Sequence, residues 1–513
     1  MTSEGFLLTK IIATLGPASS SVEVISQLIG EGVRVFRINF SHGSLDQHAQ
    51  TLSNIRRAEK ETGKYIGVLG DLSGPKIRIG EVVEGGIQVA KGERITFIKN
   101  PVLAGSKGNL TTFSSTLPQF INEVKENERI LIDDGNIELK CVTCAGSGKK
   151  DEITCEVVVG GLISTHKGIN LPETELSVDA LTEKDLECVD FAVEHHFDFL
   201  ALSFVRRAED IRMLKKILIE KDARPNVFYT SARDIGFKDK ASEDQHFIPI
   251  ITKIEKPQAI DNLEAVIRET DAVMVARGDL GVEMDISEVS ILQKQIINMC
   301  QAYGRPVIVA TQMLQSMIEV PVPTRAEVSD VANAIFDGAD AVMLSGETAV
   351  GKYPVETVRM MNKIAQRTNS YIKTNAIHPG SDLQKPDLSF RAAAIAKGVQ
   401  TIVDTIETKY LIVWTNMGGS AVYLSQYRIP VPILAFNSVE SRLRQLTLMY
   451  GIRPFMMDQP KSGSDFIRKI DRLLLKEKWA QKGDAVIIVS GDPINRKGFA
   501  NRIVIHYVGE TVD

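Results

Sequence analysis

Eight short apolar runs, rich in β-branched residues, recur along the first two thirds of this 513-residue chain. Most are separated by amphipathic helical patterns such as VEVISQLIGEG and IRMLKKILIEK. Continuous apolar strands that alternate with helices are typical of a parallel sheet covered by helices. Eight such units predict an α/β fold, a closed (β/α)8 TIM barrel whose strands end in polar residues on one rim. The predicted strands cover residues 10–16, 33–40, 65–72, 197–204, 249–256, 272–279, 306–313 and 340–347.

The spacing of the strands is interrupted once, between the third and the fourth. Residues 76–172 contain short strand-like runs separated by Gly, Asn and Asp turn signals. We interpret them as an inserted all-β domain, a β-barrel lid placed on the catalytic rim, with hinges at Gly74–Pro75 and at 168–172. The catalytic barrel then comprises residues 1–75 and 173–350.

The last third of the chain alternates strand and helix patterns again. A long helical pattern and a polar, proline-containing stretch come first, so residues 351–388 are predicted to be a linking helix and a boundary segment. Residues 389–513 are predicted to form a separate C-terminal α/β domain with a regulatory role. Residues 223–248 are polar and longer than a normal connection, and we assign this surface excursion no function.

Composition argues against several classes of partner. A formal net charge of −5 gives no global footprint for nucleic acid, so phosphate binding must come from local clusters. No apolar run is long enough to span a bilayer, and the N-terminus lacks a signal peptide pattern. Five cysteines do not suggest a disulfide framework, and we expect a cytoplasmic protein. Cys141, Cys144 and Cys155 lack the fourth ligand of a normal zinc site, so we expect them to be structural.

The fifth and sixth predicted strands both end in charged residues. Lys253 and Glu255 are two positions apart and therefore point to the same side of a strand. Asp279 closes the next run, just after Gly278. Two carboxylates at neighbouring strand ends, beside a lysine, suit a divalent metal ion and an anionic substrate. The alternative is a pair of ordinary surface charges at strand ends.

Further polar residues follow other strands and should lie on the same rim. An arginine, an amide and a hydroxyl alternate at the end of the second strand, which suits a phosphate group or a cation, although turn-capping residues are the alternative. A lysine near the second hinge could clamp a phosphate from the lid. The residues are Arg37, Asn39, Ser41 and His42 after the second strand, Asp71, Leu72, Lys76 and Arg78 around the end of the third, Thr311 at the seventh, and Lys167 in the insert.

Nine segments, read in order, resemble the pyruvate kinase family. The match runs from the first strand to the end of the barrel, and the C-terminal domain has the family's length and layout. The order of the segments and the place of the insert make the resemblance specific. The segments are KIIATLGPAS, RINFSHG, GDLSGPKIR, KGINLP, SFVRRAED, ITKIEKP, MVARGDLG, ATQML and PTRAEVSDVANAIFDGADAVMLSGETAVGKYP.

The resemblance implies a glycolytic phosphotransferase that moves the phosphoryl group of phosphoenolpyruvate to ADP, giving pyruvate and ATP. It also implies a homotetramer and a metal ion, Mg²⁺ or Mn²⁺, held by Glu255 and Asp279. Lys253, Thr311 and Arg37 would be catalytic, and the same three residues with Gly278 and Asp279 would bind the substrate. Asn39, His42, Arg78 and Lys167 resemble the residues on the family's nucleotide side.

The pocket for a monovalent cation departs from the family pattern. Many members bind K⁺ through residues that match Asn39, Ser41, Asp71 and the carbonyl of Leu72, where Thr is usual. Those members carry Glu in GPEIR, whereas this chain has Lys76. A fixed ammonium near Asp71 would supply the charge that K⁺ brings, so we expect activity that does not require K⁺. The alternative is that Lys76 points to solvent.

The segment WTNMGGSA follows a strand and opens a helix, an arrangement that binds phosphate at a helix N-terminus. In the family this loop holds sugar-phosphate activators. We expect an allosteric site for a phosphorylated effector that is not reliably fructose 1,6-bisphosphate, an ordinary tight loop being the alternative. The loop comprises Thr415, Gly418, Gly419 and Ser420, with Asn416 and Met417 at two other positions and Arg496 and Lys497 as further charges.

Two rival interpretations share this barrel. A metal-dependent lyase or aldolase acting on pyruvate-type enolates would use the same carboxylate pair, but it would have no nucleotide for Lys167 to clamp. An inactive homologue that senses metabolites through its C-terminal domain is the other. The complete set of Lys253, Glu255, Asp279 and Thr311 argues against that interpretation.

Overall fold

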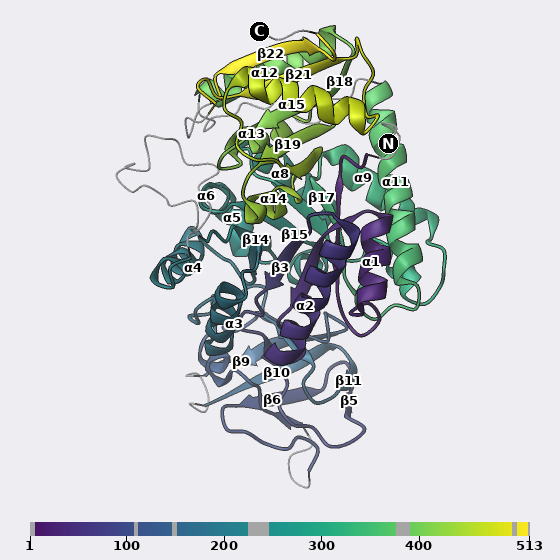
Figure 1. Cartoon of the computed structure of the whole chain (residues 1–513). Helices are drawn as coiled ribbons and strands as arrows, with labels where there is room; N and C mark the ends of the chain where they lie inside the picture. Colours follow the sequence, from purple (N-terminus) through teal and green to yellow (C-terminus); the bar gives the residue numbers. More distant parts are fainter. Residues whose placement is uncertain are drawn as a thin grey trace.

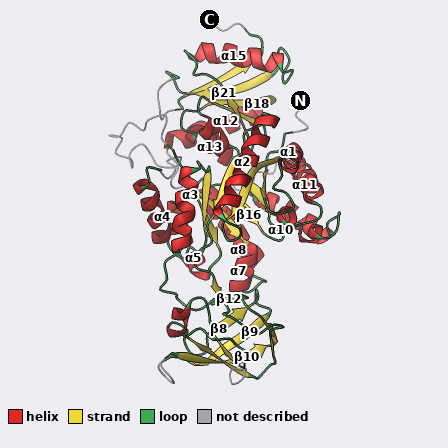
Figure 2. Ribbon diagram, turned by 60° about the horizontal axis from the view of Figure 1, so that its bottom comes forward, coloured by secondary structure: helices red, strands yellow, loops and turns green. Residues whose placement is uncertain are grey.

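The computed structural model describes residues 6–106, 111–145, 151–223, 246–375, 390–494 and 500–510. The inserted β domain and the C-terminal domain lie at opposite ends of the molecule, with the helix-covered barrel between them (Figures 1 and 2). The segment 224–245, most of the predicted surface excursion, and the boundary segment 376–389 lie outside the described residues. No helix among the described residues is long and apolar enough to cross a membrane.

Eight parallel strands close into a barrel, which confirms the predicted fold class. Each strand pairs with the next in chain order, and the eighth pairs back with the first. All eight lie within the predicted runs, but they end before most of the polar residues that close those runs. The strands are β1 (Lys10–Thr14), β2 (Val33–Asn39), β3 (Gly67–Asp71), β13 (Phe199–Leu202), β14 (Ile250–Ile254), β15 (Ala272–Ala276), β16 (Val307–Ala310) and β17 (Ala341–Leu344).

Helices cover the outside of this barrel. Several begin with a capping box, in which a Ser or Thr side chain and the side chain three residues on exchange bonds with backbone amides, as at Thr182, Thr324 and Ser44. The elements are α1 (Val22–Glu31), α2 (Leu45–Thr62), α3 (Glu183–Glu194), α4 (Ala208–Glu220), α5 (Pro257–Asp261), α6 (Leu263–Glu269), α7 (Arg277–Glu283), α8 (Val289–Ala302), η3 (Gln315–Ile318), α9 (Arg325–Asp337), α10 (Gly346–Ala349) and the linking helix α11 (Pro354–Thr374).

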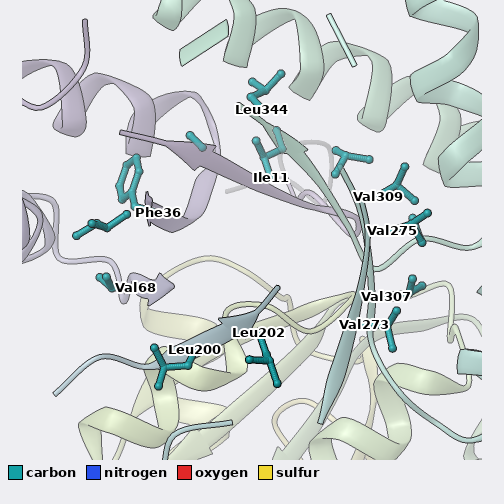
Figure 3. Close-up of a cluster of buried hydrophobic side chains, with 14 of the residues drawn as sticks. Ile11, Phe36, Val68, Leu200, Leu202, Val273, Val275, Val307, Val309 and Leu344 are labelled. Carbon is teal, nitrogen blue, oxygen red and sulfur yellow. The ribbon is translucent and has the colours of Figure 1, made fainter. Parts of the chain in front are cut away.

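The alternation of strand side chains produces two hydrophobic layers. Val273 and Val309 belong to the cluster that joins strands to helices, and Figure 3 shows them with other residues of that cluster. Their neighbours Met274 and Ile308 belong to a second cluster formed almost entirely by strand residues, the interior of the barrel. The barrel is therefore a packed core, and chemistry is left to its ends.

The insert between β3 and β13 forms a seven-stranded sheet in the order β4-β12-β8-β9-β10-β6-β7 and a two-stranded sheet β11-β5. An isolated antiparallel bridge between Ile79 and Ser115 joins the two edges of the larger sheet, so one bridge takes the place of a full ladder there. The elements are β4 (Ile77–Arg78), β5 (Ile87–Val89), β6 (Arg94–Ile98), β7 (Thr112–Phe113), η2 (Pro118–Asn122), β8 (Arg129–Ile132), β9 (Ile137–Thr143), β10 (Glu152–Val159), β11 (Gly161–Ile163) and β12 (Gly168–Asn170).

The insert has its own hydrophobic core, built around three phenylalanines whose rings contact one another, Phe97, Phe113 and Phe120. Cys141 and Cys155 are buried in this core as free thiols on neighbouring strands. Because this core is separate from that of the barrel, the insert is a structural unit of its own. We refer to it below as the lid.

The C-terminal domain is a five-stranded sheet in the order β20-β19-β18-β21-β22. The sequence predicted four of these strands and missed β20. Pro454 lies in β20, and proline is tolerated there because β20 is an edge strand. The elements are α12 (Phe390–Thr405), β18 (Thr408–Trp414), α13 (Gly419–Gln426), β19 (Ile433–Asn437), α14 (Glu440–Leu446), β20 (Ile452–Met456), α15 (Gly463–Lys476), β21 (Ala485–Ser490) and β22 (Arg502–Tyr507).

The C-terminal domain docks on the N-terminal end of the barrel. Leu448 belongs to the hydrophobic cluster of the barrel interior, so it closes that end. Two ion pairs fix the contact: Arg428 Nη2 is 2.9 Å from Asp340 Oδ2, and Arg444 Nε is 3.0 Å from Glu59 Oε1. The opposite end of the barrel, toward the lid, carries the predicted site.

Candidate active site

A buried lysine stands at the centre of the rim. Lys253 lies in β14, and its Nζ is 2.6 Å from Oε1 of Glu255, the residue that follows the strand end by one position. The same Nζ donates to Ser203 Oγ at 2.9 Å and lies 3.5 Å from Asp71 Oδ1. Side chains from β3, β14 and the residues after β13 therefore converge on one ammonium group.

Opposite charges decide the protonation of this lysine. Burial alone would lower the pKa of Lys253, but Asp71, Glu255 and Asp279 raise it above its usual value. Lys253 is therefore a fixed cation at neutral pH. For Glu255, burial raises the pKa, Lys253 opposes that change, and the negative charge of Asp279 adds to it.

Asp71 is held by two cations. Arg37 Nε and Nη2 each lie 2.6 Å from Asp71 Oδ2, while Arg37 Nη1 donates to Thr14 Oγ1 at 3.1 Å. Burial would raise the pKa of Asp71, but Lys253 and Arg37 lower it below its usual range. The carboxylate is thus ionised and orients both cations that the sequence assigned to the substrate.

The position of Asp279 differs from the prediction that it ends a strand. β15 stops at Ala276, and Gly278 and Asp279 lie in the first turn of α7. The break is fixed by Arg277, whose guanidinium donates to Asp330 Oδ1 at 2.7 Å and to Thr311 O at 2.9 Å. Asp279 is exposed at the rim, where its charge acts on both Lys253 and Glu255.

Thr311 follows β16 in an unfavourable backbone conformation. Its φ is 67°, and that of Gln312 is 53°, in the left-handed region that β-branched residues rarely adopt. Thr311 Oγ1 accepts a hydrogen bond from Gly278 N at 2.7 Å and donates to Ala310 O at 2.7 Å. Such strain persists only where surrounding contacts impose it, and it is concentrated at functional sites.

The residues predicted to face a nucleotide are divided between barrel and lid. Asn39 Oδ1 accepts from Ser41 N at 3.1 Å, and partial burial together with Lys76 and Arg78 lowers the pKa of the neighbouring His42. On the lid, Arg78 Nη1 donates to His166 O at 3.0 Å. Lys167, also on the lid, forms an ion pair with Asp133 at 2.7 Å.

The predicted cation pocket already contains protein donors. The carbonyl of Leu72 accepts a hydrogen bond from Ser203 Oγ at 2.7 Å, and Arg37 and Lys253 pair with Asp71 as described. The side chain of Lys76 is exposed, and its charge lowers the pKa of Asp71 less than the charges of Lys253 and Arg37 do. Ser203 was not predicted to belong to the site. The one indication in the sequence is that Ser203 lies near the end of a predicted strand.

The predicted effector loop joins β18 to α13. Gly418, with φ of 90°, donates its amide to Thr415 Oγ1 at 2.9 Å, and Gly419 begins the helix. Asn437 Nδ2 donates to the carbonyls of Thr415 and Asn416. The loop is thus held by Thr415 and by Asn437 at the end of β19, and Ser420 is half-buried in the first turn of α13. Arg496 and Lys497 lie outside the described residues.

The carboxylate pair fits a hard divalent cation. Mg²⁺ is commonly held by one or two carboxylates together with substrate oxygens rather than by a complete protein cage. Asp279 raises the pKa of Glu255, which shows a repulsion that a shared cation would relieve. No group of three or more His, Cys, Asp or Glu side chains suited to a metal occurs in the part of the chain that the structure describes. A metal at Glu255 and Asp279 would therefore need substrate or water as further ligands.

Comparison with known proteins points to one family. The family model of the pyruvate kinase barrel domain matches residues 7–236 and 227–358, and that of the pyruvate kinase alpha/beta domain matches residues 393–506. Pyruvate kinase from Corynebacterium glutamicum is 38% identical over 506 residues, with 98% of each chain covered, and that from Mycobacterium intracellulare is 39% identical over 503 residues, with the same coverage.

A crystal structure of a pyruvate kinase from Cryptosporidium parvum superimposes with a TM-score of 0.87 at 31% sequence identity, covering 99% of this chain and 97% of that one. The relatives therefore match the barrel, the lid and the C-terminal domain together, over almost their whole length. The fold, the converging charges of the rim and these matches lead to one conclusion: the chain belongs to the pyruvate kinase family.

Proposed function

We propose that this enzyme transfers the phosphoryl group of phosphoenolpyruvate to ADP at the rim around Lys253, with Mg²⁺ or Mn²⁺ bound by Glu255 and Asp279. The observation that carries the proposal is the buried ammonium of Lys253, held within 2.6 Å of Glu255 and 3.5 Å of Asp71. Phosphoryl transfer depends on positioning and charge neutralisation more than on covalent catalysis. A fixed cation that is already dehydrated stabilises the charge of the transition state without reorganising solvent.

The chain's own groups divide the remaining work. Arg37, oriented by Asp71, contacts the transferring phosphoryl group, and Lys253 stabilises that group and the enolate oxygen left behind. A metal ion held by Glu255 and Asp279 would supply Lewis-acid neutralisation of the substrate's anionic oxygens. Gly278, Asp279 and the Thr311 hydroxyl hold the substrate carboxylate, and the same hydroxyl orients the water that gives a proton to the enolate carbon.

On the other side of the phosphoryl group, Asn39 and His42 from the barrel and Arg78 and Lys167 from the lid bind the nucleotide. Because two of these residues move with the lid, its closure completes the nucleotide site and excludes water. The domain boundaries at 75–76 and 172–173 belong to this proposal, since they place the hinges.

A stoichiometric assay tests this function. Purified protein with phosphoenolpyruvate, ADP and Mg²⁺ should form pyruvate and ATP in equal amounts. Pyruvate without ATP would indicate the rival lyase, and no product would indicate the inactive homologue. Lys352→Met is the control, because Lys352 pairs with Glu319 on an exposed surface and should not alter the rate.

We also propose that activity does not require K⁺, because protein cations already surround Asp71 and Lys76 adds a further positive charge. The rate in buffer balanced with tetramethylammonium should change little on addition of K⁺. An increase of about tenfold or more, equivalent to about 1.4 kcal/mol of transition-state stabilisation, would contradict this.

Regulation through the C-terminal domain is the third part of the proposal. A phosphorylated effector bound at the loop Thr415–Ser420 should change the half-saturating concentration of phosphoenolpyruvate. Sugar phosphates and nucleoside monophosphates can be screened for this effect, and the absence of any response would contradict it. We further propose a cytoplasmic homotetramer, which sedimentation analysis of the purified protein tests.

A further inference from the structure

Both connections between barrel and lid contact one group of side chains, two of them buried and two partly buried. We call Phe204, Lys256, Glu283 and Asn170 the hinge cluster. Phe204 follows β13, Lys256 follows β14, Glu283 ends α7, and Asn170 ends the lid strand β12. Lys256 and Glu283 are almost fully buried, and none of the four belongs to the substrate or nucleotide groups assigned above.

The first hinge packs against Phe204. Gly74 has φ of 64°, and a Cβ atom at this position would come within 2.6 Å of Phe204 Cδ2, so the ring lies directly against the hinge backbone. The amides of Ser73 and Gly74 donate to Asp185 Oδ1 at 2.8 and 3.3 Å, which ties the barrel side of this hinge to α3.

The second hinge is held through Glu283. Asn170 Nδ2 donates to Glu283 Oε1 at 2.7 Å, and the same oxygen accepts from Lys256 Nζ at 2.6 Å. The other oxygen, Oε2, is buried and has no hydrogen-bond partner among the described residues. A buried carboxylate with few donors depends strongly on each of them, because little water replaces a lost partner.

The hinge cluster also contacts Glu255, one of the two carboxylates proposed to bind the metal. Lys256 Nζ lies 5.2 Å from the centroid of the Phe204 ring, a cation–π contact. The amide of Phe204 donates to Glu255 Oε2 at 2.9 Å. Glu283 closes the short helix α7 whose first turn carries Asp279. Both hinges are therefore anchored on barrel residues that lie next to Glu255 or on the helix that carries Asp279.

We infer that Asn170, Glu283 and Lys256 act as positioning residues that latch the lid in register with the carboxylates of the active site. The inference rests on the proposed function, since it concerns how the lid-borne Arg78 and Lys167 are brought to the nucleotide. With the latch formed, both hinges are fixed relative to Glu255. With the latch broken, the barrel keeps its substrate site, and the lid loses its defined position.

An exchange of charge across the Asn170–Glu283 contact tests the latch. Asn170→Asp places a second carboxylate against Glu283 and should raise the KM for ADP about tenfold or more, because like charges in this partly buried contact repel. The KM for phosphoenolpyruvate, whose residues lie on the barrel, should change by less than about threefold. Adding Glu283→Gln restores a donor–acceptor pair at the same net charge, and the double variant should recover most of the affinity for ADP.

The outcomes separate this inference from the proposed function. If wild-type protein forms no ATP from phosphoenolpyruvate and ADP, the proposed function is wrong. If wild-type protein is active and Asn170→Asp leaves the KM for ADP unchanged, or the double variant shows no recovery, only the latch is wrong.

A second variant guards against misfolding of Asn170→Asp. Asn170→Ala removes the hydrogen bond without adding charge and should raise the KM for ADP in the same direction by a smaller factor. An unchanged KM for ADP in folded Asn170→Ala would also overturn the latch. Lys352→Met is the control for each measurement, because its ion pair with Glu319 is exposed and neither residue belongs to the hinge cluster.

Discussion

Two buried lysines lie at opposite ends of the barrel, and their charges are set in opposite ways. Lys10 begins β1 at the end covered by the C-terminal domain, and its Nζ donates to the carbonyl of Ile452 at 2.6 Å. Burial and the nearby Arg34 and Arg453 lower the pKa of Lys10 to about 7. Lys253 is equally buried at the other end, but carboxylates surround it and raise its pKa.

The comparison shows that burial alone does not decide what a lysine does. In a low-dielectric site the sign of the neighbouring charge determines whether the ammonium is retained. At the N-terminal end, charged groups fix the C-terminal domain through the Arg428–Asp340 and Arg444–Glu59 pairs. At the rim, ionised groups also lie close together, but they hold no second domain in place. Chemistry on an anionic substrate requires such a cluster of ionised groups.

The largest effect should come from breaking a pair at the docked end. Arg428→Met leaves the Asp340 carboxylate buried without its cation, and such a loss typically costs about 3–5 kcal/mol. We expect a clear fall in the midpoint of urea unfolding with a nearly unchanged KM for phosphoenolpyruvate at low temperature. An equal loss of substrate affinity would show that the two ends of the barrel are not independent.

Removing the rim lysine should, unlike Arg428→Met, lower the rate strongly. Lys253→Met takes away the preformed cation, and loss of one such electrostatic group typically lowers kcat by about 10²–10³-fold, or about 2.7–4 kcal/mol. The unfolding midpoint should fall as well, because Asp71 and Glu255 lose a buried cation. Retention of more than a tenth of wild-type kcat would mean that Lys253 does not act on the transferring group.

The pH dependence of stability should distinguish the two lysines. Lys10 has its folded-state pKa near 7, below the ordinary value of 10.5, so between these pH values the unfolded chain binds a proton that the folded chain lacks. Stability therefore rises with pH in this window, by about 2 kcal/mol between pH 7 and pH 9 from this residue alone.

Lys10→Met should accordingly stabilise the protein more at pH 7 than at pH 9. Urea unfolding of wild type and variant at both pH values measures the difference. A stabilisation that does not depend on pH would mean that Lys10 keeps its proton in the folded protein. Lys253, whose pKa is raised, should contribute no change in this window, because both its folded and unfolded forms are protonated there.

The smallest effect concerns the charge near Asp71. Lys76→Glu replaces an exposed cation by an anion and should make the rate depend on K⁺ by about tenfold, or about 1.4 kcal/mol. The comparison is the ratio of rates with and without K⁺ in wild type and variant. Equal ratios would show that Arg37 and Lys253 alone neutralise Asp71 and that Lys76 has no part in it.

Much of the fold followed from local patterns. Eight apolar runs, the turn-rich insert and the alternating C-terminal third predicted the barrel, the lid and the second α/β domain, because hydrophobic periodicity is a property of neighbouring residues. The edge strand β20 was not predicted, because Pro454 interrupts the residue pattern by which strands are recognised. Lys253 and Glu255 were predicted to face the same way, and their contact of 2.6 Å agrees with that.

The remaining features depend on residues distant in sequence. The sequence could not indicate that Ser203 contacts Lys253, that Arg277 donates to the carbonyl of Thr311, or that Asn170 contacts Glu283 across a hinge. Residue types and strand periods determine which side chains reach the rim. Only the closing of the barrel decides which charged groups become neighbours. Carboxylates next to Lys253 raise its pKa, whereas burial and neighbouring arginines lower the pKa of Lys10.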